Sequence, residues 1–125
     1  MTAGDALAQA AVLRPGARVS TEMRLGWLRE ADGLIRERFF ARCDADPYGD
    51  VGADRTQQPD EETELLVPSP FDALYPHYLC ARIDAALGET DRYAGEQGQY
   101  NEILGQLAAW LRRSYPPRAG CQWKW

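Results

Sequence analysis

Hydrophobic residues recur along most of this chain at spacings of three and four, the pattern of helices that bury one face. The pattern predicts a short helix over residues 5–14, capped by Asp5 and ending before Pro15, and a long second helix over residues 20–43, capped by Ser20. In the second helix we expect a core stripe of Met23, Trp27, Ala31 and Leu34, widened by Leu28, Ile35 and Phe39.

The second half of the chain predicts two further helices, over residues 76–87 and 89–114. Pro76 suits a helix start because its missing amide costs nothing there, and we expect a separate short turn at 72–75 before it. Gly88 is suited to end the third helix in the left-handed conformation. For the fourth helix the expected core stripe is Tyr93, Tyr100, Leu104, Leu107 and Leu111, with Ile103 and Trp110 as a second stripe.

Residues 44–64 interrupt the helical pattern. They are rich in turn formers and hold eight acidic residues against one basic residue, whereas the chain from Trp110 onward holds four basic residues and no acidic one. A 21-residue irregular loop is uncommon in so small a domain, and such loops tend to be functional. The apolar run at 65–67 predicts an extended segment packed on the helices, or a strand that pairs with part of the loop. The opposite charges suit a subunit that meets its neighbour end to end.

Together these elements predict an all-α fold, a small bundle of about four helices, one of them short, with a long acidic loop between the second and third. We expect one domain over residues 1–117, followed by a tail over 118–125, because 125 residues are too few for two ordinary domains. No run approaches the ~20 apolar residues of a membrane span, and the first residues do not resemble a signal peptide. The odd number of widely spaced cysteines fits a reducing compartment: Cys43, Cys80 and Cys121.

Catalytic and metal-binding constellations are not evident in the sequence. His77 and Cys80 are spaced i, i+3, but zinc requires three or four ligands and no other Cys or His lies at ligand spacing. A Cys–His nucleophile pair would lack an orienting group. The acidic pair Asp84/Glu89 is more typical of a solvated surface than of a cation site. Phosphate-binding glycines follow a strand, whereas three glycines here lie in a helical pattern: Gly95, Gly98 and Gly105. We therefore expect no enzyme activity, no catalytic, cofactor-binding or metal residues, and no cofactor.

Residues 63–79, TELLVPSPFDALYPHYL, resemble the TELLVPxPYDxLYxxYL stretch of a family of small proteins from the structural-gene clusters of phages and prophages of Gram-positive bacteria. The RLGWLREADGLI helix over 24–35 and the closing helix with Trp110 and Pro116 are also similar to that family. The resemblance covers about residues 6–117 and is most specific over 63–79. It departs at the three glycines named above, where the family tends to have larger residues, and over residues 121–125.

This resemblance implies an all-helical head–tail connector, also called an adaptor or head-completion protein. Such proteins assemble as a ring, usually twelve-fold, between the portal and the stopper or tail-completion protein, around a channel that DNA passes through. The expected partners are thus other copies, the portal and the tail components; the free chain can be monomeric. The expected location is the virion neck, and the bacterial host cytoplasm before assembly, with no membrane contact.

The alternative is a small helical regulatory or DNA-binding interaction protein. It requires a basic recognition helix that enters a DNA groove, and no such helix is visible in the sequence. The net charge of −5 also disfavours binding to phosphates.

Overall fold

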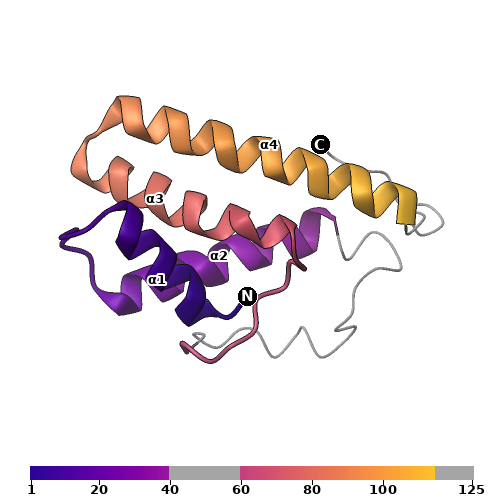
Figure 1. Cartoon of the computed structure of the whole chain (residues 1–125), viewed down its shortest axis with the longest axis horizontal. Coiled ribbons are helices and arrows are strands. Elements are labelled where there is room, and N and C mark those ends of the chain that lie inside the picture. Colours follow the sequence, from indigo (N-terminus) through magenta and orange to yellow (C-terminus); the bar gives the residue numbers. More distant parts are fainter. Residues whose placement is uncertain (40–59, 115–125) are drawn as a thin grey trace.

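The computed structural model describes residues 1–39 and 60–114, which form an all-α bundle (Figure 1). Its elements, in order, are α1 (Ala3–Leu13), α2 (Thr21–Arg38), the 3-10 turn η3 (Phe71–Ala73), α3 (Leu74–Leu87) and α4 (Thr90–Ser114). The described residues thus hold four α-helices, one of them short, and no strand, which confirms the predicted fold class. The predictions for Cys43, Cys121, most of the acidic loop and the tail over 118–125 lie outside the described residues.

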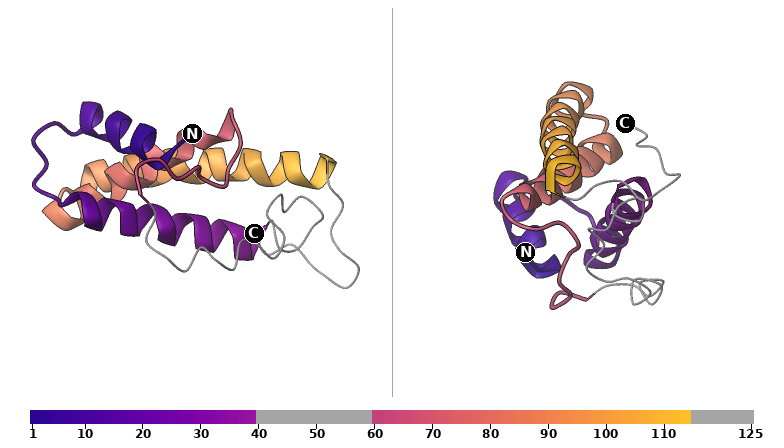
Figure 2. Two further views of the ribbon diagram at one scale, coloured as in Figure 1. Left: turned by 90° about the horizontal axis from the view of Figure 1, so that it is seen from below. Right: turned by 90° about the vertical axis from the view of Figure 1, so that its right-hand side faces the viewer.

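The third helix is the centre of the bundle. α3 packs against α1, α2 and α4, and it runs antiparallel to α4, which is the longer of the two (Figures 1 and 2). The C-terminal end of α1, the N-terminal end of α2 and the α3–α4 turn lie at the same end of the molecule. Within the described ranges, no helix is both long and apolar enough to cross a bilayer.

Local capping determines most helix ends. Ser20 Oγ accepts a hydrogen bond from Met23 N at 3.2 Å, and Gly88 ends α3 with φ of 76°; both caps were predicted. In α1 the cap is Thr2 and not Asp5. Thr2 Oγ1 accepts from Asp5 N, and Asp5 Oδ2 accepts from Thr2 N, both at 3.2 Å, a reciprocal capping box that begins the helix earlier than predicted.

Pro76 lies inside the first turn of α3, and the prediction that the helix begins at Pro76 is wrong. The turn η3 leads directly into α3, which begins at Leu74. The first amides of a helix have no partner within the helix, so a proline at the third position removes no helical hydrogen bond. The fold therefore places Leu74 and Tyr75, both fully buried, on the helix itself.

The predicted core residues of α2 are confirmed at Leu28, Ala31, Ile35 and Phe39, whereas the predictions for Met23, Trp27 and Leu34 are not. Met23 and Leu34 are 53% and 51% exposed, and Trp27 is half-buried, whereas the buried hydrophobic residues of α2 and its cap are Leu25, Leu28, Ala31, Ile35 and Phe39. The buried face also includes Asp32, a polar residue that the hydrophobic pattern left out. In α4 the predicted stripe is confirmed except at Tyr93, which lies in the exposed first turn.

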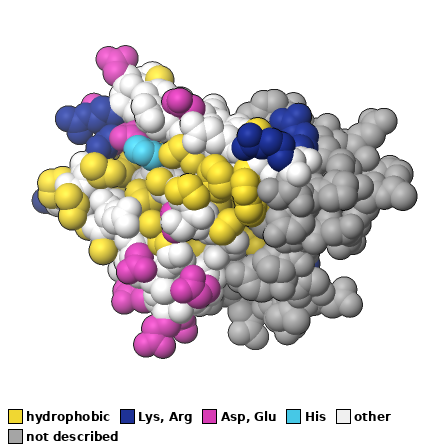
Figure 3. Space-filling model, turned by 45° about the vertical axis from the view of Figure 1, so that its right-hand side comes forward, with side chains coloured by type: hydrophobic (Ala, Val, Ile, Leu, Met, Phe, Trp, Pro, Cys, Tyr) yellow, Lys and Arg dark blue, Asp and Glu magenta, His cyan; other side chains and the backbone are white. Residues whose placement is uncertain are grey.

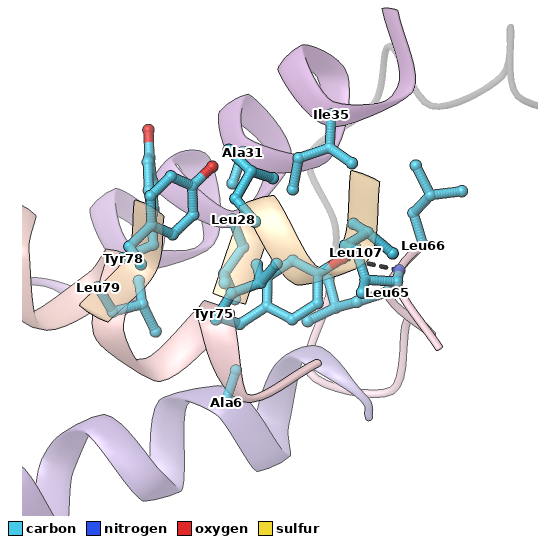
Figure 4. Close-up of a cluster of buried hydrophobic side chains, with 14 of the residues drawn as sticks. Ala6, Leu28, Ala31, Ile35, Leu65, Leu66, Tyr75, Tyr78, Leu79 and Leu107 are labelled. Carbon is cyan, nitrogen blue, oxygen red and sulfur yellow. Dashed lines mark hydrogen bonds between the residues drawn. The ribbon is translucent and has the colours of Figure 1, made fainter. Parts of the chain in front are cut away.

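Residues 64–67 run as an extended segment through the middle of the core. Leu65, Leu66 and Val67 are buried and belong to the same hydrophobic cluster as side chains from all four helices. Figure 4 shows Leu65 and Leu66 within this cluster. The segment packs on the helices, as one of the two predictions held, and its backbone pairs with the N-terminus. Glu64 forms an isolated antiparallel bridge with Thr2, and Leu65 N donates to Met1 O at 3.0 Å.

Candidate functional site

An ion-pair cluster joins α1 to α3 and α4 near one end of the bundle. Arg14 Nε donates to Asp84 Oδ1 and Arg14 Nη2 donates to Asp84 Oδ2, both at 2.9 Å, the two-pronged geometry that fits a guanidinium to a carboxylate. Arg14 Nη2 also donates to Glu96 Oε1 at 3.0 Å. The hydrogen bond to Asp84 is the main cause of a pKa of Arg14 above its ordinary value. Arg14 is therefore charged and tied to three helices.

His77 extends this cluster along α3. Its Nδ1 lies 2.7 Å from Glu96 Oε2, and the ring is half-buried. A histidine oriented by a carboxylate is one part of a general base, but a base acts only on a group within hydrogen-bond reach. In the part of the chain that the structure describes, the hydrogen bonds of His77 lead to Glu96 and to no hydroxyl or thiol.

Cys80, one turn after His77, is fully buried beneath the same cluster. Burial raises the pKa of its thiol to about 11, and the charge of Glu96 adds to this effect. The thiol is therefore protonated at neutral pH, the opposite of an activated nucleophile. Across residues 1–39 and 60–114, no three His, Cys, Asp or Glu side chains are grouped so that they could hold a metal ion.

Asp84 does not form the surface pair with Glu89 that its sequence position suggested. It is 1% exposed and bound to Arg14, while Glu89 is exposed in the α3–α4 turn. Seventy residues separate Arg14 from Asp84 along the chain, so no spacing rule indicated their contact. The only sequence signal was an arginine at the end of a helix, directly before Pro15.

A second buried polar cluster holds the extended segment in the core. Asp32 Oδ2 accepts from Leu66 N at 3.2 Å, and Asp32 Oδ1 accepts from Tyr75 Oη. Val67 N in turn donates to Tyr75 Oη at 2.9 Å (Figure 4). A buried backbone amide without a partner is costly, and an extended segment that lies alone between helices has no ladder to supply one. Asp32 and Tyr75 supply these partners from α2 and α3.

A third cluster lies at the surface between α2 and α3. Tyr78 Oη and Arg82 Nη2 both donate to the carboxylate of Glu30 at 3.1 Å. The guanidinium of Arg82 lies 5.8 Å from the ring centroid of Trp27 and 5.9 Å from that of Tyr78. Burial raises the pKa of Tyr78, with a further increase from Glu30. The contact between Arg82 of α3 and Trp27 of α2 is a cation–π interaction that joins the two helices.

The acidic segment is described only from Asp60 onward, where it forms a turn. Asp60 Oδ1 accepts from Glu62 N at 3.0 Å and from Thr63 Oγ1 at 2.9 Å, so Asp60 stabilises the turn. Glu61 and Glu62 are exposed. On the face seen in Figure 3, acidic side chains gather below an area of hydrophobic side chains.

Each cluster thus connects elements of the bundle, and within the described residues none pairs a base with a nucleophile. Comparison of the chain with models of protein families, with curated proteins and with solved structures finds no match.

Proposed function

We propose that the chain is a structural virion protein, a head–tail connector that assembles as a ring between the portal and the tail components of a phage or prophage. The observation that carries this proposal is the place of residues 63–79, the most specific part of the resemblance, in the bundle. Seven residues of this segment are buried in the core: Leu65, Leu66, Val67, Leu74, Tyr75, Tyr78 and Leu79. A resemblance in these residues supports a shared fold, because they join the extended segment to α3.

The polar clusters also fit a structural role. A connector carries out no reaction; it needs a body that keeps its shape while its outer surfaces bind neighbours. The ion pairs of Arg14 and the hydrogen bonds of Asp32 connect elements far apart in the sequence. Buried polar groups with all their partners favour one arrangement of the core. This rigidity supports the proposal without requiring an active site.

Exposed apolar side chains favour a protein that assembles. Val12 and Leu13 are 80% and 45% exposed at the end of α1, Leu87 is exposed at the C-terminal end of α3, and Tyr93 is exposed in the first turn of α4. These positions lie at the end of the bundle that holds the α3–α4 turn (Figure 1). Exposed apolar side chains gathered at one end of a protein are typical of a binding surface. In a ring each copy repeats its contacts, so contacts that are weak singly become strong together.

The decisive experiment removes the chain from a phage that encodes it. A nonsense codon in its gene should leave filled heads and separate tails, seen by electron microscopy, with infectivity lost. Purified wild-type chain, added to the extract, should restore joined particles. Complete infectious virions made without the chain would contradict the proposal.

A binding experiment distinguishes the connector from the alternative of a DNA-binding protein. Purified portal rings should retain the chain in a sedimentation assay, and a short DNA duplex should not shift in a gel at low salt. Binding to phosphates weakens steeply with salt, so a duplex bound at 50 mM salt and released at about 200 mM would favour the DNA-binding alternative.

A further inference from the structure

An apolar area with opposite charges at its two ends covers one side of the bundle. Its centre is formed by Phe71 of η3 and by Ile103 and Trp110 of α4, which are half-buried and packed on the core. The rings of Phe71 and Trp110 lie 5.5 Å apart between centroids. Aromatic side chains at the centre of an exposed area are typical of protein interfaces.

The two ends of this area differ in charge. Arg113 follows Trp110 by one turn of α4, so both lie on one side of the helix, and Arg113 is exposed. At the other end, Asp72 follows Phe71, and Asp72 Oδ2 lies 3.4 Å from the amino group of Met1. Glu64 Oε2 lies 3.5 Å from the same amino group, and Glu61 is held beside α1 by the bond from Gly4 N to Glu61 O.

We call this surface the graded face: Arg113 at its basic end, the Phe71, Ile103 and Trp110 centre, and Glu61, Glu64 and Asp72 at its acidic end. Figure 3 shows hydrophobic side chains between basic side chains at the upper right and acidic side chains below. The order of charges, and not the net charge, distinguishes this face.

We propose that the graded face binds the graded face of a second copy of this chain, related by a two-fold axis through the apolar centre. The rotation places the basic end of each copy against the acidic end of the other, so that every favourable contact occurs twice. A nucleic acid or a uniformly charged peptide would be attracted by one end and repelled by the other. The charge order therefore favours a second copy as the partner.

This inference goes beyond the connector function and does not depend on it. A ring joins two different surfaces of neighbouring copies, whereas the two-fold pair uses one surface on both copies. The pair would be a form of the free chain, before it meets other components.

The test measures the mass of the full-length chain against concentration by sedimentation equilibrium. The wild type should pass from one copy to two as concentration rises. Arg113→Glu should raise the dissociation constant of the pair about tenfold, because two attractions become two repulsions. Arg92→Glu makes the same charge change on an exposed residue in the first turn of α4, away from the face, and should leave the dissociation constant unchanged.

Mixing variants tests the two-fold arrangement itself. Glu61→Arg alone should also weaken pairing, with Glu89→Arg in the α3–α4 turn as its control. An equal mixture of Arg113→Glu and Glu61→Arg should pair as a heterodimer with wild-type affinity, because one of its two contacts is the wild-type contact and the other is restored with reversed charge. Circular dichroism checks that each variant folds.

Three results would overturn the proposal: a wild type that stays monomeric at millimolar concentration, an effect of Arg113→Glu equal to that of Arg92→Glu, or a mixture that does not pair. Assemblies larger than two copies that the same variants disrupt would show a head-to-tail contact and would also overturn the two-fold arrangement.

Discussion

Asp32 and Asp84 are both buried aspartates, but their partners differ. Asp84 binds a cation, the guanidinium of Arg14, and this contact joins side chains of two helices. Asp32 accepts hydrogen bonds from the hydroxyl of Tyr75 and from the backbone amide of Leu66. The Arg14 cluster therefore balances the charge of Asp84, and the Asp32 cluster satisfies the backbone of a segment without regular secondary structure.

The difference follows from what each region has to bury. Helices satisfy their own backbone groups, so the polar cluster at the end of α1 needs only to match side chains to one another. The segment at 64–67 brings unpaired amides into the core, and each requires an acceptor. The irregular backbone at 64–67 can be buried because Asp32 of α2 and Tyr75 of α3 lie beside it.

The largest effect should follow from removing the acceptor that serves the backbone. Asp32→Ala leaves Leu66 N and the Tyr75 hydroxyl without this partner in the core, and each buried unsatisfied group costs about 1–3 kcal/mol. We expect the free energy of unfolding to fall by about 3–5 kcal/mol in a urea titration.

A milder variant keeps the comparison measurable if Asp32→Ala does not fold. Tyr75→Phe removes only the hydroxyl and deprives Val67 N of its acceptor, so it should cost about 1–3 kcal/mol. A loss below about 0.5 kcal/mol in both variants would mean that the segment does not depend on these bonds.

Removing Asp84 from the Arg14 cluster should lower the free energy of unfolding by less than removing Asp32. Asp84→Ala should lower the free energy of unfolding by about 2–3 kcal/mol, below the usual cost of breaking a buried pair, because Arg14 keeps Glu96 as a partner. Arg14→Met combined with Asp84→Leu should recover most of this loss, since apolar residues of similar size often replace a buried ion pair without cost. Thermal unfolding of the wild type and of the two variants measures the difference. A double variant no better than Asp84→Ala would show that the pair is needed for more than charge balance.

The smallest effect concerns Cys80, beneath the Arg14 cluster. Its thiol has a pKa of about 11 in the folded chain against an ordinary value of 9.0, so folding favours the protonated form. The stabilisation that comes from the protonated thiol is complete below pH 9 and is lost as pH rises towards 11. By pH 10 the free energy of unfolding should have fallen by about 1 kcal/mol. Cys80→Ala should therefore lower stability at pH 7 but flatten its fall between pH 8 and 10, in urea titrations at each pH. An equally steep fall in Cys80→Ala would place the titrating group elsewhere.

Local signals were sufficient for the presence and order of the helices, although not for the first residues of α1 and α3. The caps at Ser20 and Gly88 were predicted because a cap is a hydrogen bond or a backbone angle within a few residues of the chain. The core stripe of α4 was predicted because its apolar positions repeat regularly through several turns. The all-α fold and the order of its elements follow from such signals, and they were confirmed in the described residues.

Contacts between distant residues were decided by the tertiary structure alone. The pairing of Thr2 with Glu64, the bond from Arg14 to Asp84 and the burial of Asp32 each depend on how the helices pack, and not on nearby sequence. The buried face of α2 belongs to the same group: its sequence offers two adjacent apolar stripes, and the packing of α2 against α3 and α1 selects one. A hydrophobic pattern specifies that a helix has a buried side, but the elements that pack against the helix decide which side it is.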